Sequence, residues 1–168
     1  MINGGIFGPK LSGKTTLAKK LADDYFTVYG MQSLVFDPHL ETWGKHAFVT
    51  AQEEKFWPCV WNMQGKLIIV EEAAATIRRE RDLVPVFTRL RHNNHKLLVV
   101  GHSGMDLLPV MRQQLDVIYL FRQPEKASIV WAENFCESGL LKSQELRQYE
   151  FIRLEMYGKP EKFILPKP

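Results

Sequence analysis

The sequence has few cysteines and no long apolar stretch, so it lacks the marks of a disulfide-rich or a membrane protein. It has two cysteines in 168 residues, Cys59 and Cys136, and they are neither close together nor accompanied by clustered histidines. A disulfide-stabilised fold and a zinc site are therefore not expected, and free thiols suit the reducing cytoplasm. No apolar stretch approaches the eighteen or so residues of a membrane-spanning helix, so we predict no membrane span.

A strong net charge is also missing. The formal net charge is +3, which is compatible with nucleic-acid binding but too small to indicate it. Internal repeats, low-complexity segments and Ser/Gly-rich linkers are absent too, which argues against a repeat protein or a string of domains. With 45% apolar residues, the chain has enough material for one packed α/β domain, which we expect to span residues 1–168.

What the sequence does contain is one well-defined motif near its start. The pattern G-x-x-x-x-G-K-[ST] is matched at every defined position by Gly8, Pro9, Lys10, Leu11, Ser12, Gly13, Lys14 and Thr15. The apolar segment 1–7 before the motif is typical of a buried strand, and Leu17 and Leu21 after it are spaced as on a helix. Strand, loop and helix in this order favour a phosphate-binding P-loop over a chance glycine-rich turn.

The chemistry of such a loop explains its spacing. Backbone N–H groups turn inward around phosphate oxygens, and the following helix points its N-terminus at the same anion. We therefore expect residues 8–16, Thr16 included, to bind the phosphates of a nucleotide, which we take to be ATP. Lys14 would place its ammonium group against the β- and γ-phosphates, and the Thr15 hydroxyl would join the ligands of Mg²⁺.

The rest of the chain alternates between apolar runs and helix-length segments. Strands are predicted at 33–36, 47–49, 66–70, 96–100 and 117–121. Helices are predicted at 53–61, 83–91, 125–137 and 140–148, with Pro58 disturbing the first of them. Strands made almost wholly of Val, Ile and Leu indicate a mainly parallel central sheet with helices on both faces, and segments 151–154 and 163–165 favour a C-terminal β-hairpin.

Polar residues follow several predicted strands, where ligands of parallel sheets bind. The strand at 66–70 ends in Glu71 and Glu72, as in a Walker B motif. We assign Glu71 to Mg²⁺ and Glu72 to the attacking water; the alternative is that both only cap a helix start. His102 follows the next strand, where it would contact the γ-phosphate or the water, or would be an ordinary strand-end histidine.

Arginines are frequent between these two strands. Hydrolysis of a nucleoside triphosphate is slow without a cation at the developing charge, and a neighbouring subunit often supplies it. Arg89 and Arg91 are our first choices for that residue, with Arg112 and Arg122 as alternatives. For each arginine the other interpretation is surface charge or DNA contact.

The order of these motifs resembles the HerA/FtsK superfamily of DNA-pumping ATPases. The resemblance rests on the P-loop, Asp37-Pro38, Glu71-Glu72, the Arg89-to-His102 segment and Arg122, and so spans nearly the whole chain. It implies a RecA-like P-loop NTPase fold, ATP with Mg²⁺, and a ring, commonly a hexamer, with DNA threaded through its centre. Two positions depart from the family pattern, because aspartate is usual at Glu71 and glutamine at His102.

Within that superfamily the short chain is similar to viral genome-packaging ATPases and to the nucleotide-binding part of filamentous-phage assembly proteins. We therefore predict an ATP-hydrolysing DNA translocase of the host cytoplasm or virion, with a capsid or portal-vertex protein as a further partner. Two alternatives stay open from the sequence: a small-molecule or nucleoside kinase with the same P-loop, and a nucleotide-binding regulator that does not hydrolyse.

Overall fold

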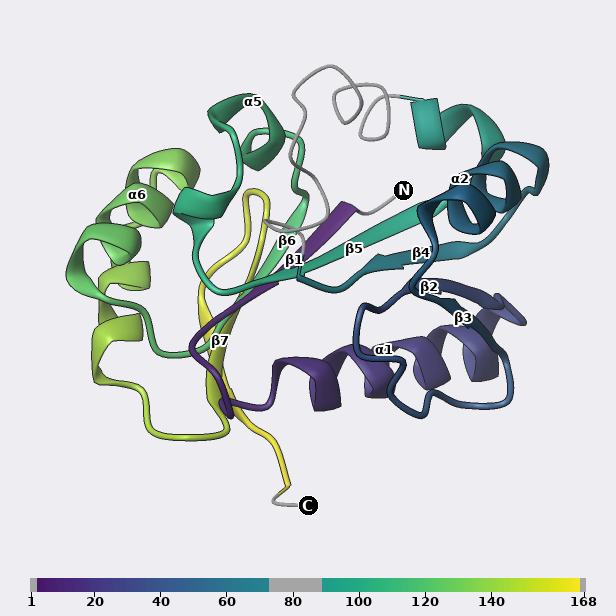
Figure 1. Cartoon of the computed structure of the whole chain (residues 1–168). Helices are drawn as coiled ribbons and strands as arrows, with labels where there is room; N and C mark the ends of the chain where they lie inside the picture. The colour runs from purple at the N-terminus through teal and green to yellow at the C-terminus, as the bar shows by residue number, and fades with distance from the viewer. Residues whose placement is uncertain (1–2, 73–88, 167–168) are drawn as a thin grey trace.

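A central eight-stranded sheet organises the computed structural model, which describes residues 3–72 and 89–166 (Figure 1). The strand order is β3-β2-β4-β5-β1-β6-β7-β8. The strands are β1 (Asn3–Phe7), β2 (Ser33–Phe36), β3 (Ala47–Thr50), β4 (Leu67–Val70), β5 (Lys96–Gly101), β6 (Val117–Leu120), β7 (Glu150–Glu155) and β8 (Glu161–Ile164). Strands β1 to β6 run parallel, and β7 and β8 add an antiparallel hairpin beside β6. The predicted parallel sheet and C-terminal hairpin are confirmed.

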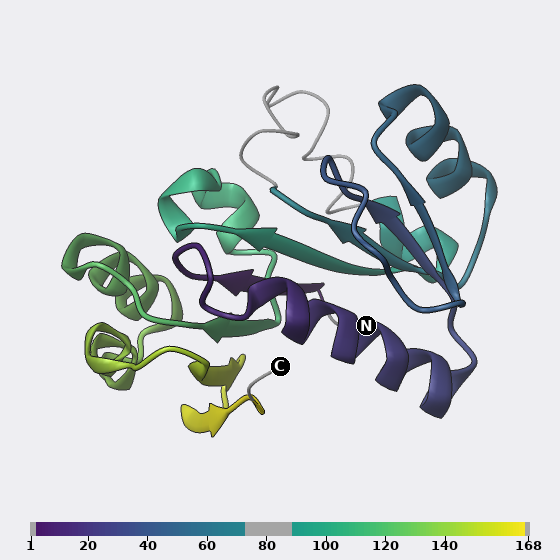
Figure 2. The ribbon, with the colours of Figure 1, turned by 60° about the horizontal axis from the view of Figure 1, so that its bottom comes forward.

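Helices cover both faces of this sheet, as predicted. They are α1 (Lys14–Tyr29), α2 (Glu53–Asn62), α5 (Pro109–Arg112) and α6 (Glu125–Phe135), with 3₁₀ helices η1 (Leu90–Asn93), η2 (Gly104–Asp106) and η3 (Ser138–Glu145). Helix α1 lies on one face, whereas α2, α5 and α6 lie on the other (Figures 1 and 2). In the part of the chain that is described, no helix is both long and apolar enough to cross a membrane.

Each face of the sheet has its own core. Ile6 and Phe7 of β1 are both fully buried but point to opposite faces, because successive side chains of a strand alternate. Ile6 packs in the cluster beneath α1. Phe7 packs against Trp131 of α6, with 4.7 Å between ring centroids, and Phe135 packs against Trp131 in turn. Trp131 is thus part of the core on this face, and the partly buried Phe135 packs against it.

One of the predicted helices differs in type from what is observed, and another lies mostly outside the described residues. The helix expected at 140–148 is instead the 3₁₀ helix η3, which begins where the Glu137 side chain accepts a hydrogen bond from the Gly139 N–H. It ends at Leu146, whose extended backbone cannot continue a helix. Of the helix expected at 83–91, residues 83–88 lie outside the described residues, Arg89 is helical, and the 3₁₀ helix η1 follows at Leu90.

Candidate active site

A cavity of about 460 Å³ lies at the carboxyl ends of the parallel strands. Its walls bring together residues from the P-loop, from the segments after β2 and β4, from the end of β5 and the residue after it, and from the residue before β7: Lys10, Leu11, Gly13, Lys14, Thr15, Thr16, Asp37, His39, Glu41, Glu71, Glu72, Val100, Gly101, His102 and Tyr149. Lys14, Thr15, Glu71, Glu72 and His102, which the sequence assigns to one site, thus line one cavity. Gly8, Pro9 and Ser12 belong to the same loop but are not among its lining residues.

Neighbouring strands hold the P-loop in shape through its backbone. At its start, the Phe121 N–H donates to the Phe7 carbonyl at 2.9 Å, and a Cβ atom added to Gly8 would lie 2.5 Å from the Cβ of Phe121. At its end, Gly13 has φ 107°, in the left-handed region that glycine tolerates best. Gly8 is therefore required because there is no room for a side chain, and Gly13 because of its backbone conformation.

The first two residues of α1 face the cavity. The Lys14 ammonium donates to the Pro9 carbonyl at 2.9 Å, so the lysine bends back over its own loop. Burial lowers the pKa of Lys14, and the negative charges of Glu71 and Glu72 act in the opposite direction. The Thr15 hydroxyl is hydrogen-bonded to the Glu71 side chain. The two residues that the sequence assigns to Mg²⁺ are therefore in contact.

Glu71 is the most buried of the acidic groups that follow β4. It is 6% exposed, and burial raises the pKa of its carboxyl to about 7, helped by the charges of Asp37 and Glu41 and opposed by Thr15 and Lys14. A cation beside this carboxyl would favour the ionised form and lower the pKa again. A hydroxyl oxygen next to a carboxylate oxygen fits the oxygen ligands that Mg²⁺ prefers, with phosphates and water completing the shell.

Glu72 follows directly but points elsewhere. Its backbone has φ 48°, a left-handed conformation that is uncommon for residues other than glycine. The Oε1 atom of Glu72 lies 3.1 Å from Nε2 of His39, and this hydrogen bond raises the pKa of His39. Adjacent residues in the sequence are thus separated in space, with Glu71 toward the P-loop and Glu72 toward the segment after β2.

Asp37, at the end of β2, builds the segment that carries His39. Its carboxylate is 2% exposed and accepts hydrogen bonds from the His39 N–H at 2.9 Å, the Glu41 N–H at 2.9 Å and the Trp43 indole N–H at 3.0 Å. Trp43 is itself buried, so these bonds fix the segment to the core beneath α1. Asp37 therefore shapes one wall of the cavity.

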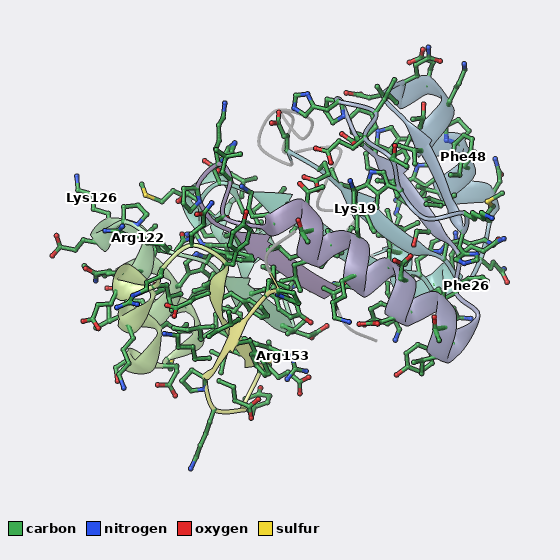
Figure 3. The ribbon with its side chains drawn as sticks, turned by 90° about the horizontal axis from the view of Figure 1, so that it is seen from below. Lys19, Phe26, Phe48, Arg122, Lys126 and Arg153 are labelled. Carbon is green, nitrogen blue, oxygen red and sulfur yellow. The ribbon has the colours of Figure 1, made fainter. Side chains whose placement is uncertain are left out.

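Among the described side chains, no arginine lines this cavity. Arg89 is exposed, and the side chain of Arg91 lies outside the described part of the structure. Arg112 donates from Nη1 to the carbonyls of Gly104 at 2.8 Å and Leu107 at 2.7 Å, which ties it to its own chain. Arg122 is exposed just after β6, and Figure 3 shows it at the same end of the molecule as Lys126 of α6.

Three cavity residues were not found by sequence reasoning. His39 and Glu41 follow the strand-end Asp37-Pro38, so the rule that found Glu71 and His102 could have found them as well. Tyr149 comes from the C-terminal part of the chain and has φ 65°. Its ring lies close to Gly13 of the P-loop: a Cβ atom added to Gly13 would be 3.0 Å from it. No local sequence pattern reveals this proximity.

Comparisons with known proteins bear on the fold. No protein-family model matches the sequence, and comparison with curated proteins finds no relative. The genome-packaging NTPase B204 from Sulfolobus turreted icosahedral virus 2, in complex with AMPPCP, superposes with a TM-score of 0.79 at 17% identity over 99% of this chain and 98% of that one. The fold is that of a P-loop NTPase.

Two further P-loop NTPase structures are similar. The N-terminal domain of zonular occludens toxin from Neisseria meningitidis gives a TM-score of 0.62 at 14% identity, covering 99% of this chain and 96% of that one. The cytoplasmic domain of the Type VII secretion ATPase EccC from Thermomonospora curvata gives 0.65 at 13% identity, covering 96% of this chain and 25% of that one. These likenesses confirm the predicted P-loop NTPase fold.

Proposed function

We propose that this chain is a Mg²⁺-dependent ATPase that moves DNA during viral genome packaging. The observation that carries the proposal is the cavity in which Lys14, Thr15, Glu71 and Glu72 meet at the end of the P-loop. The likeness in fold to packaging NTPase B204, which has been solved with AMPPCP and with ATP-gammaS, supports ATP as the ligand.

Each of these residues has a distinct part in the proposed reaction. The P-loop N–H groups and Lys14 bind the phosphates and neutralise their charge. Thr15 and Glu71 would hold Mg²⁺, which would supply further charge neutralisation on the phosphate oxygens. Glu72 orients a water molecule toward the γ-phosphorus and accepts its proton as ADP and phosphate form. His102 lines the same cavity and would contact the γ-phosphate.

We further propose that the active form is a ring, commonly a hexamer in the proteins it resembles, around DNA. The described walls of the cavity contain lysine but no arginine, so the cation that completes the site would come from the next copy. Arg89 and Arg91 are the proposed donors, with Arg122 as the alternative. A capsid or portal-vertex protein would hold the ring in place during packaging, in the host cytoplasm or the virion.

Phosphate release from ATP, measured with and without DNA, tests the proposal. We expect Mg²⁺-dependent hydrolysis that DNA stimulates, and a mass measurement that gives a multiple of the 19.5 kDa chain when ATP and DNA are added. Transfer of phosphate to a nucleoside or another small acceptor would identify a kinase instead. Nucleotide binding without turnover would identify a regulator, and a monomer under all conditions would exclude the ring.

A further inference from the structure

The segment after β2 presents one imidazole to the cavity from a fixed backbone. His39 is held through its own N–H by Asp37, whose other carboxylate oxygen binds the Glu41 N–H and the buried indole of Trp43. The Leu40 N–H donates to the Asp37 carbonyl at 3.1 Å and tightens the same turn. Although the His39 side chain is 63% exposed, the backbone that carries it is anchored on both sides.

The imidazole meets Glu72 across the cavity. Nε2 of His39 lies 3.1 Å from Oε1 of Glu72, and the two residues come from segments 33 positions apart in the sequence. Glu72 has a left-handed backbone at φ 48°, and its side chain is 37% exposed. A partly exposed glutamate side chain, with two methylene groups before its carboxylate, can adopt several rotamers. A hydrogen bond from a partner with a fixed backbone favours one of them.

That selection matters if Glu72 orients the attacking water. A catalytic carboxylate is effective only when it is held near the reactive geometry, and a displacement of about 1 Å can cost about a hundredfold in rate. A hydrogen bond to Oε1 fixes the plane of the carboxylate and therefore the direction in which Oε2 lies. The orientation of Glu72 would then depend on a second residue of the same cavity wall.

We propose that His39 is a positioning residue for Glu72, which it holds in the orientation needed for hydrolysis. The inference rests on the proposed ATPase function and adds to it a residue outside the P-loop, the Walker B acids and the arginines. Because His39 acts on the carboxylate and not on the phosphates, it affects the rate of the chemical step and leaves nucleotide binding unchanged.

Steady-state hydrolysis of Mg²⁺-ATP by His39 variants tests this role. We expect His39→Ala to lower kcat about tenfold, with KM and the affinity for AMPPCP unchanged, because hydrolysis alone depends on the orientation of Glu72. His39→Gln, whose amide nitrogen has a reach similar to that of Nε2, is expected to recover kcat to within about threefold of the wild type. If His39→Ala does not fold, His39→Leu replaces it, since it fills similar space without a donor.

A matched control lies in the same connection between β2 and β3. His46 stacks on Phe26 and does not line the cavity, so His46→Gln is expected to leave kcat and KM at their wild-type values. In a Glu72→Gln background, His39→Ala is expected to cause no further loss of the residual rate, because the group through which His39 acts is already changed.

Each remaining outcome overturns the inference. An unchanged kcat in His39→Ala, or a raised KM with unchanged kcat, would show that His39 does not act through Glu72. An equal loss of kcat from His39→Ala in the wild-type and in the Glu72→Gln background would also show that His39 does not act through Glu72. If the wild-type protein hydrolyses ATP and the Lys14→Ala variant does not, these results reject only the role of His39 and leave the proposed function standing. If the wild type does not hydrolyse ATP, the proposed function and the inference fail together.

Discussion

The two walls of the cavity keep their shape by different means. The P-loop wall, residues 8–16, is held through its own backbone: the Gly8 N–H donates to the Gly101 carbonyl, the Leu11 carbonyl accepts from Gln148, and glycines occupy two tightly constrained positions. The acidic wall, formed by Asp37, His39, Glu41, Glu71 and Glu72, is held by side-chain hydrogen bonds. Those of Asp37 are local to the segment after β2, and that between His39 and Glu72 joins segments 33 positions apart. A single side-chain change should therefore remove one function from the P-loop wall but loosen several parts of the acidic wall.

The largest effect is expected on the P-loop wall, from Lys14→Ala. Removing the ammonium group takes away the positive side chain of the phosphate site, so binding of ATP and AMPPCP should fall below detection by titration calorimetry. Lys20→Ala is the matched control, because Lys20 lies on the same helix but is 59% exposed and paired with Asp24. An unchanged affinity in Lys14→Ala would refute the assignment of the P-loop.

On the acidic wall, Glu72→Gln should separate binding from chemistry. The amide keeps the shape of the side chain but cannot accept the proton of the water, so kcat should fall by about 10²–10⁴-fold while AMPPCP still binds. The assay is phosphate release at saturating ATP. Glu54→Gln, an exposed change in the first turn of α2, should turn over at the wild-type rate. Turnover retained by Glu72→Gln would place the base on another residue.

A smaller effect, and one on stability, is expected from Asp37→Ala. The change leaves the N–H groups of His39, Glu41 and Trp43 without their acceptor, at a cost of about 2–4 kcal/mol in the free energy of unfolding. Equilibrium denaturation in urea measures this loss. Thr42→Ala, an exposed change within the same segment, should stay within about 0.5 kcal/mol of the wild type. Equal stability of the two variants would contradict the anchoring role of Asp37.

The smallest effect is a shift in the titration of His39. Its pKa is raised above the ordinary 6.5 because its hydrogen bond to Glu72 favours the imidazolium. The stabilisation from this contact is therefore fully present below pH 6.5 and is lost as the pH rises through the folded-state pKa. An NMR titration of the imidazole signals should give a lower pKa for His39 in Glu72→Gln than in the wild type. The same value in both proteins would argue against the contact.

The P-loop wall could be predicted from sequence because its geometry is local. Residues 8–15 are contiguous, and the strand and helix that flank them are visible in the apolar pattern. Glu71, Glu72 and His102, which line the cavity, could be found for a related reason. Runs of Val, Ile and Leu mark fully buried parallel strands, and the carboxyl ends of such strands meet along one edge of the sheet.

The acidic wall could be predicted only in part because its contacts are long-range. The side chains of His39 and Glu72 meet only after β2 and β4 have paired. The left-handed backbone of Glu72 could not be predicted either, because glutamate is not a residue type that indicates this conformation. A helix was predicted at 140–148, but its 3₁₀ type and its bounds, Ser138–Glu145, could not be predicted from the apolar pattern. The roles of Arg89 and Arg91 stay predictions, since they concern a contact between copies.

The hairpin that ends the sheet has a consequence for solubility. Among the described strands β8 is the last on its side, and all four of its residues are exposed, so its outer peptide groups could template pairing with another molecule. Pro160 and Pro166 stand close to its two ends, and Glu161 and Lys162 place charges on it. The shortness of the strand, its two charges and the flanking prolines all work against strand addition at an edge that also exposes Phe163 and Ile164.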